Sequence, residues 1–324
     1  EVGHGGGGEG AEADVGLQRQ RGHGRHGIGG AGGVGLEGAG VAALAAAALL
    51  IGHRLVPEPV GTFLDTGLPW LGAPIAVLAA VAAAARSGAG AIAAAAALAC
   101  WGSVFAPALL AGPADAVAPG LRVASVNLRA GNPDPCAALG VLAARGADLI
   151  AAQEMTGAAS ACPTGLKYST AAGTVGLWSR FPLAVGEPVD VGIGWRRALR
   201  AEVATPQGPV TVYAAHLASL RPGTTAQRNA SLRRLARAAT GSGAERVLVL
   251  GDFNTAGTDR RLGAFAGFTD AQDEAGRGLG FTWPASVPLV RLDHAMARGL
   301  RAVRAGVVEV PGSDHRAITA AYAR

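Results

Sequence analysis

The sequence predicts an α/β fold preceded by a helical membrane segment. Three observations lead to this expectation. Six short apolar runs of strand character each end or begin with an acidic, amide or histidine residue. Stretches of helical character lie between some of these runs. Three longer apolar stretches come before them, within residues 36–110. Polar residues gathered at strand ends are typical of a catalytic face built on the edge of a sheet.

The most informative strand is the apolar run Val247–Leu250, which leads into Gly251-Asp252-Phe253-Asn254. Residues i and i+2 of an extended chain point to the same face. Asp252 and Asn254 are therefore expected to share one face at the end of this strand.

The other predicted strands carry similar residues at their ends. Asn127 ends Val123–Val126, Glu154 follows Leu149–Gln153, His216 ends Val210–Ala215, Asp293 and His294 follow Leu289–Leu292, and Ser313-Asp314-His315 precedes Ala317–Tyr322. Each residue alone has an ordinary structural explanation, such as a turn former or a helix cap. Together they indicate a catalytic face at the edge of a sheet.

In chain order these motifs resemble those of the endonuclease/exonuclease/phosphatase superfamily, whose fold is shared with DNase I-like nucleases. The resemblance covers residues 121–324. It implies a four-layer α/β/β/α sandwich of two packed mixed sheets. The outer helices are expected at residues 135–145 and 225–240, and the second of these has apolar residues at helical spacing.

The resemblance also implies a metal site. Glu154 would be the main ligand, with Asn127 and Asp314 nearby. This set is made of carboxylate and amide oxygens without a thiolate, which selects Mg²⁺, with Mn²⁺ as the alternative. No organic cofactor is implied.

The remaining site residues are assigned roles by the same resemblance. Asp252 would orient or deprotonate the attacking water, and Asn254 would hold the phosphate or that water. His315, oriented by Asp293, would act as general base or phosphate contact, and His216 would contact the phosphate from the opposite side. His294 is expected to be structural, because neighbours in a strand point to opposite faces. Arg197, Arg200 and Arg228 are weaker candidates for phosphate contacts, since each can equally be an ordinary surface arginine.

The N-terminal third has three apolar stretches, at residues 36–56, 68–85 and 88–110. A membrane span needs about 20 mainly apolar residues. A cleaved signal peptide explains one such stretch but not three, and a soluble bundle would show polar helix faces. We therefore expect a Gly-rich disordered tail over 1–38, a transmembrane region of about three helices over 39–111, a linker over 112–120 and a catalytic domain over 121–324.

Basic residues predict the orientation of the spans. Arg19, Arg21 and Arg25 precede the first span, and Arg86 lies between the second and third. The positive-inside rule places both segments in the cytoplasm. Three spans then put the catalytic domain outside the cell, close to the membrane. There, Cys136 and Cys162 could form a disulfide; the alternative is two small buried residues.

Charge and composition narrow the substrate. Residues 121–324 hold 23 Lys and Arg against 15 Asp and Glu, a difference of +8. A basic domain suits a phosphate-bearing substrate or an anionic membrane surface. Aromatic residues make up only 5% of the chain, which leaves few surfaces for stacking bases. Nucleic acid is therefore a less favoured partner than membrane lipid.

The layout of tail, spans and external domain resembles that of membrane-anchored vancomycin/teicoplanin resistance proteins. That resemblance implies a phosphatase acting on undecaprenyl pyrophosphate, the spent lipid carrier of cell-wall synthesis. The alternatives are a membrane-tethered or secreted nuclease, a phosphodiesterase of phospholipid or sphingolipid head groups, and a catalytically dead anchor or binding module. The retained set of acidic and histidine residues argues against the last.

Overall fold

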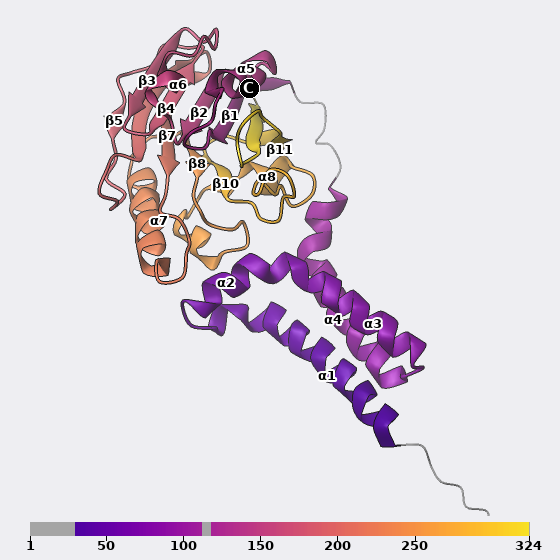
Figure 1. The fold of residues 1–324 in the computed structure, drawn as a ribbon. Helices are drawn as coiled ribbons and strands as arrows, with labels where there is room; N and C mark the ends of the chain where they lie inside the picture. Colours follow the sequence, from indigo (N-terminus) through magenta and orange to yellow (C-terminus); the bar gives the residue numbers. More distant parts are fainter. Residues whose placement is uncertain (1–29, 112–117, 324) are drawn as a thin grey trace, which may run out of the picture.

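The chain forms a helical region that continues into a sandwich of two β-sheets (Figure 1). The computed structural model describes residues 30–111 and 118–323. The helices come first along the chain, and the sheets are built from the residues beyond 118.

Each sheet of the sandwich has six strands. The first sheet has the order β11-β12-β1-β2-β4-β3, with strands β1 (Pro119–Asn127), β2 (Leu149–Gln153), β3 (Tyr168–Ala172), β4 (Val175–Ser179), β11 (Ala302–Val308) and β12 (Ala317–Ala323). The second has the order β5-β6-β7-β8-β10-β9, with strands β5 (Glu187–Pro188), β6 (Ala198–Thr205), β7 (Gly208–His216), β8 (Val247–Asp252), β9 (Thr269–Asp270) and β10 (Asp293–Arg298).

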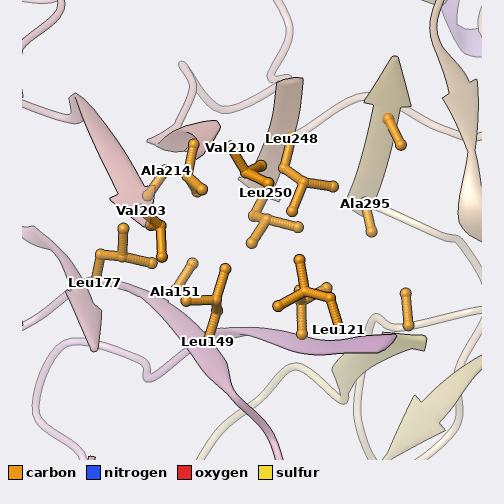
Figure 2. Close-up of a cluster of buried hydrophobic side chains, with 14 of the residues drawn as sticks. Leu121, Leu149, Ala151, Leu177, Val203, Val210, Ala214, Leu248, Leu250 and Ala295 are labelled. Atoms are coloured by element: carbon orange, nitrogen blue, oxygen red, sulfur yellow. The ribbon is translucent and has the colours of Figure 1, made fainter. Parts of the chain in front are cut away.

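Apolar side chains fill the space between the two sheets. Leu149 and Leu177 of the first sheet meet Val203, Leu248 and Leu250 of the second (Figure 2). All five are fully buried. This shared core holds the two sheets face to face.

Helices cover the outer faces of both sheets. Helix α5 (Pro135–Ala144) buries Leu139 and Leu142 against the first sheet. Helix α7 (Thr225–Thr240) buries Leu232 and Leu235 against the second. The predicted four-layer α/β/β/α sandwich is therefore confirmed. The remaining short elements are α6 (Gly157–Ser160), η3 (Arg260–Ala264) and α8 (Ala271–Ala275).

Two parallel pairs bring strand ends together. β1 runs parallel to β2, which aligns Asn127 with Gln153, the residue before Glu154. β7 runs parallel to β8, which aligns His216 with Asp252. Because parallel strands end at the same edge of a sheet, the polar residues that follow them meet there.

One predicted strand was wrong. Leu289–Leu292 contributes only an isolated bridge between Val290 and Trp283, and strand β10 begins at Asp293. Since β10 is antiparallel to β8, its first residue must lie where β8 ends, and Asp293 pairs with Asp252. Asp293 reaches the expected edge from the start of a strand rather than from its end.

The helical region contains three helical stretches that are long and apolar enough to cross a membrane, over 38–55, 60–84 and 88–110. The first comprises α1 (Gly30–Gly52) and η1 (His53–Leu55), the second α2 (Val60–Gly67), η2 (Leu68–Leu71) and α3 (Gly72–Ala84), and the third α4 (Gly88–Leu110). Ile75, Ala94 and Ala97 are buried where these helices pack together.

The predicted boundaries of this region shift in two places. Of the expected disordered tail 1–38, residues 1–29 lie outside the described part, but residues 30–38 belong to α1. Extending an existing helix avoids the cost of nucleation, so the helix continues into Gly-rich sequence. Of the expected linker, residues 112–117 lie outside the described part, whereas Pro119 and Gly120 belong to β1.

Helix α2 lies against the sandwich (Figure 1). Arg260, on the sandwich, binds both carboxylate oxygens of Asp65 on α2, at 2.7 and 2.9 Å. Arg261 binds Glu58 at 2.8 Å. These contacts fix the first part of the second apolar stretch to the sandwich; that stretch, 60–84, starts earlier than the expected span 68–85.

Cys136 and Cys162 form a disulfide with a Cα–Cα distance of 5.0 Å. The bond joins the start of α5 to the segment after α6. Of the two alternatives open at the sequence level, the structure contains the covalent one.

Candidate active site

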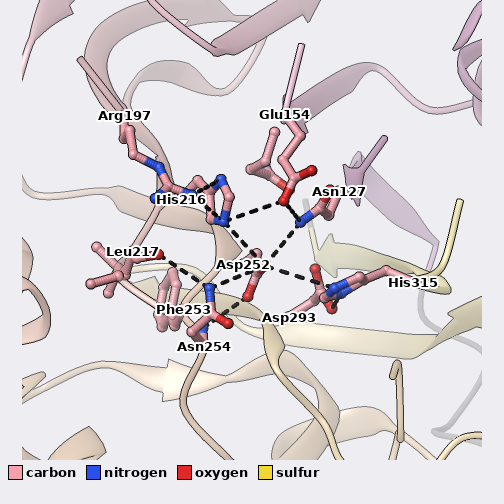
Figure 3. A network of polar contacts seen from close by, with 12 residues as sticks. Asn127, Glu154, Arg197, His216, Leu217, Asp252, Phe253, Asn254, Asp293 and His315 are labelled. Atoms are coloured by element: carbon pink, nitrogen blue, oxygen red, sulfur yellow. Dashed lines mark hydrogen bonds and ion pairs between the residues drawn. The ribbon is translucent and has the colours of Figure 1, made fainter. Parts of the chain in front are cut away.

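A cluster of polar side chains lies where the strands of both sheets end (Figure 3). It contains the last residues of three strands, Asn127 of β1, His216 of β7 and Asp252 of β8. Glu154 follows β2, Asp293 begins β10, and His315 precedes β12. Of the eight site residues expected from sequence, only Asp314 has no side-chain hydrogen bond or ion pair with the others in the described structure.

Asn127 connects the two sheets. Its amide nitrogen Nδ2 donates to Glu154 Oε1 at 3.2 Å and to Asp252 Oδ2 at 3.0 Å. Its carbonyl oxygen accepts from the backbone N–H of Arg129 at 2.9 Å. Both ends of the amide are thus held, and the two carboxylates are fixed close to each other.

Glu154 is the accessible carboxylate of the cluster. Its side chain is 29% exposed, whereas that of Asp252 is 2% exposed. Its backbone has a φ of 54°, a left-handed conformation that costs free energy for a residue with a side chain. Oε2 accepts from the N–H of Ala130 at 2.6 Å, which leaves Oε1 directed at the centre of the site.

Asp252 and Asn254 form a tight turn rather than two independent ligands. Asp252 Oδ1 accepts from the N–H of Asn254 at 2.8 Å. Asn254 Nδ2 donates to the carbonyl of Leu217 at 3.1 Å and approaches Asp252 Oδ2 at 3.3 Å. The amide nitrogen of Asn254 is therefore engaged with the protein, and its carbonyl oxygen is the part left for water or substrate.

Gly251 makes the approach of β8 to β7 possible. Its φ is 149°, and a Cβ at this position would stand 1.9 Å from the carbonyl oxygen of Ala215. No other residue type fits so close to the neighbouring backbone. The Gly in the motif thus determines where Asp252 is presented.

His315 and Asp293 form a buried pair. His315 Nδ1 lies 2.8 Å from Asp293 Oδ2, and Nε2 lies 3.9 Å from Asp252 Oδ2. Burial alone would lower the pKa of His315, but the carboxylate of Asp293, with smaller contributions from Asp252 and Asp314, raises the pKa to about 10. His315 is therefore an imidazolium at neutral pH, directed at Asp252.

Burial raises the pKa of Asp252, and Asp293 adds to this increase, while His315 and His216 oppose it. A carboxylate made more basic by its surroundings is a better proton acceptor. Asp252 therefore has the character of a general base.

His216 lies on the opposite side of the cluster. Its Nε2 is 3.7 Å from Glu154 Oε1 and 3.6 Å from Asp252 Oδ2. Burial, together with the charge of Arg197, lowers its pKa to about 4 against the opposing effect of Asp252. His216 is therefore neutral at pH 7.

Of the three arginines considered as weaker phosphate contacts, Arg197 lies at the site. Its guanidinium contacts the ring of His216 and packs over Trp195, 5.4 Å from the ring centroid. Arg197 immediately precedes β6 and lies beside the end of β7, where its carbonyl accepts from the N–H of His216 at 2.7 Å. Arg197 brings a positive charge to the same edge as the carboxylates.

The other two arginines lie elsewhere. Arg228 is completely buried on α7, where it binds Asp259 at 2.6 Å and Thr255 at 3.2 Å. Arg200 pairs with Glu187 at the surface.

His294 is structural, as expected. It is fully buried, its Nδ1 lies 2.6 Å from Asp270, and its Nε2 lies 2.8 Å from the carbonyl of Thr255.

The donors at the site fit a hard divalent cation. Ligand atoms of Asp252, Asp293 and His315 lie within 4.8 Å of one another. Asp293 Oδ1 is buried and has no hydrogen-bond partner in the described structure. Glu154 adds an accessible carboxylate beside Asn127. Oxygen-rich donor sets of this kind suit Mg²⁺ or Mn²⁺.

Comparison with known proteins identifies the family. The model of the endonuclease/exonuclease/phosphatase family matches residues 124–315, so the chain belongs to this family. The sequence motifs had implied this membership. A comparison with curated proteins finds no match.

Several solved structures share the fold. D. rerio TDP2 complexed with a single-strand DNA product is 18% identical, with a TM-score of 0.55, covering 63% of this chain and 99% of that one. Truncated Caenorhabditis elegans TDP2 is 20% identical, with a TM-score of 0.52 and coverages of 63% and 97%. The mannosyl-6-phosphatase Bt3783 of Bacteroides thetaiotaomicron is 17% identical, with a TM-score of 0.52 and coverages of 63% and 100%. At these identities the similarity concerns the fold.

Proposed function

We propose that the protein is a membrane-anchored, Mg²⁺-dependent hydrolase that removes phosphate from a lipid-linked pyrophosphate at the outer face of the membrane. Undecaprenyl pyrophosphate is the substrate we infer. The layout resembles the vancomycin/teicoplanin resistance protein VanJ, and the proposal extends to a role in resistance to such glycopeptides.

The observation that carries the proposal is the position of the catalytic edge. The loop that leaves β8 after Asn254 continues to Arg260, which binds Asp65 on α2. Trp70, in η2 of the second apolar stretch, donates its indole N–H to the carbonyl of Leu289, four residues before Asp293. The strand ends that carry the site are thus joined to the ends of the apolar helices, where a lipid phosphate would be presented.

Glu154, positioned by the amide of Asn127 and with Asp314 as a further oxygen donor, would hold the metal ion. When bound, such an ion neutralises charge on the phosphate oxygens and on the leaving group. Because the Asp314 carboxylate is exposed, we assign it a weaker contribution than Glu154.

The proton chemistry falls to the buried residues. Asp252, with its raised pKa, would accept the proton of the attacking water, and the carbonyl oxygen of Asn254 would orient that water. His315, charged through Asp293, would contact the phosphate from one side. His216 and Arg197 would contact it from the other. His315, His216 and Arg197 would thus offer hydrogen-bond donors to the dianionic phosphate, while Asp252 remains as the base for the attacking water.

An extracytoplasmic site is supported by two features. The Cys136–Cys162 disulfide suits an oxidising compartment. The α3–α4 turn, which contains Arg86, lies at the end of the helices away from the sandwich (Figure 1), as the positive-inside rule requires for an external domain.

The first experiment is phosphate release by the purified protein in detergent with Mg²⁺. Undecaprenyl pyrophosphate and duplex DNA are offered in parallel, to wild type and to His315→Ala. We expect phosphate release from the lipid, lost in the variant. Cleavage of DNA alone would replace the proposal with the nuclease alternative.

The nuclease alternative has one supporting observation. Trp195 is 60% exposed beside Arg197, and an exposed indole next to a cation can stack a base. If the DNA assay is positive, Trp195→Ala should reduce cleavage of DNA and leave lipid hydrolysis unaffected. Phospholipid and sphingomyelin head groups form a third assay, for the phosphodiesterase alternative.

A further inference from the structure

An apolar loop lies between the active site and the membrane helices. Residues 283–290 contain no charged side chain. Trp283 and Val290 close the loop by pairing with each other, with hydrogen bonds of 3.0 Å in both directions. Between them, Val287 is 63% exposed and Leu289 is 42% exposed. Exposed apolar residues gathered in one loop indicate a surface that contacts something other than water.

Trp70 joins this loop to the apolar helices. Its indole N–H donates to the Leu289 carbonyl at 2.9 Å, and its ring stacks on Phe281 with centroids 5.7 Å apart. Trp70 is itself 45% exposed and lies in η2, directly before α3. Tryptophan is enriched at the level where a membrane meets water. We call Trp70, Trp283, Val287 and Leu289 the apolar rim.

The other side of the loop touches the active site. The N–H of Ala285 donates to the carbonyl of Asp314 at 2.7 Å, and the N–H of Arg316 donates to the carbonyl of Thr282 at 2.8 Å. Thr282 Oγ1 in turn accepts from the N–H of Leu292, next to Asp293. The residues on both sides of His315 are therefore bonded to the loop that carries the rim.

A cavity of about 190 Å³ lies at the same boundary. Pro69 and Phe105 line it from the helices, and Phe281 and Val290 line it from the sandwich. Apolar surface thus continues from the helices, through this cavity, to the base of the loop.

We propose that the apolar rim contacts the bilayer, so that a lipid substrate reaches the active site without leaving the membrane. The partner is bilayer lipid. The argument is the continuity of the rim with the apolar helices through Trp70. The inference rests on the proposed function, because a rim of this kind serves a site whose substrate has a hydrocarbon chain.

The contact is tested without reference to catalysis. Val287→Cys is made in a Cys100→Ala background, labelled with an environment-sensitive fluorophore, and placed in nanodiscs that contain nitroxide-bearing lipid. Val185→Cys, 87% exposed near β5 on the part of the sandwich away from the helices, is the matched control. We expect quenching at 287 to exceed quenching at 185 several-fold. Equal quenching at the two positions would overturn the proposal.

A second measurement tests the consequence for the substrate. The ratio of kcat/KM for undecaprenyl pyrophosphate in vesicles to that for a short, water-soluble prenyl pyrophosphate should fall at least tenfold in Val287→Ser/Leu289→Ser. Val185→Ser should leave that ratio unchanged. An unchanged ratio in the double variant would contradict delivery through the rim. If neither pyrophosphate is hydrolysed, the proposed function fails, and the quenching still decides whether the rim contacts lipid.

Discussion

Arg260, on the loop that follows the active-site strand β8, is bound to Asp65 on helix α2. The guanidinium bonds both carboxylate oxygens and also donates to the backbone carbonyls of His53, Arg54 and Val56. Asp65 is fully buried. Gly61 leaves room for this contact, since a Cβ there would stand 2.7 Å from Arg260 Nη2. One side chain thus fixes the helical region to the loop of the catalytic edge.

Removing this pair should loosen the junction. Asp65→Asn leaves Arg260 without its carboxylate, and breaking a buried ion pair costs about 3–5 kcal/mol. The measurement is denaturant unfolding in detergent. Arg200→Gln, which removes a surface pair with Glu187, is the control, and there we expect a loss of less than about 1 kcal/mol. Equal effects of the two substitutions would show that the Arg260–Asp65 pair is not an anchoring contact.

The pKa of His315 should depend on Asp293. In Asp293→Asn the carboxylate that contributes most to stabilising the imidazolium is gone while burial remains, so the pKa of His315 should fall well below about 10. Histidine NMR on metal-free protein measures it, with the exposed Asp190→Asn as control.

The same shift predicts a pH dependence of stability. Because the folded pKa of His315 lies above the unfolded value, its contribution is fully present below about pH 6.5 and is lost as the pH rises toward 10. The free energy of unfolding of wild type should fall over this range by more than that of Asp293→Asn. Parallel curves for the two proteins would contradict the assignment of the raised pKa to Asp293.

Metal binding should depend on Glu154. Glu154→Gln removes the accessible carboxylate, and we expect the affinity for Mn²⁺, measured by electron paramagnetic resonance, to fall at least about tenfold, a change found even for residues that only orient metal ligands. Glu202→Gln, an exposed glutamate on β6, should bind as wild type does. EDTA should abolish hydrolysis, and Mg²⁺ should restore it. Full Mn²⁺ affinity in Glu154→Gln would show that Glu154 is not the main metal ligand.

Gly251→Ala should disrupt the catalytic edge. The added Cβ overlaps the carbonyl oxygen of Ala215, which is backbone and has no room to shift. We expect a loss of several kcal/mol in unfolding free energy, on the scale of other steric and backbone disruptions. Gly140→Ala, where nothing lies within 4 Å, should be neutral or stabilising by up to about 1 kcal/mol because alanine favours a helix. Similar stability of the two variants would contradict the close approach of β7 and β8.

The sequence alone determined the family fold, the three apolar stretches and the residues that gather at the strand ends. These are local properties: periodicity, length of apolar runs and the identity of residues at strand ends persist whatever the chain packs against. Asn127, Glu154, His216 and Asp252 could be assigned in this way because each follows a run of strand residues.

Tertiary structure decided the rest. The direction of β10 places Asp293 at the start of its strand, and only strand pairing sets that direction. Arg197 reaches His216 because β6 pairs with β7. Arg228, in contrast, is buried on α7, where it forms an ion pair with Asp259 of the loop after β8. The contacts of Asp65 with Arg260 and of Trp70 with Leu289 join residues about 200 positions apart. No local pattern encodes such contacts, because their free energy depends on two surfaces that meet only in the folded chain.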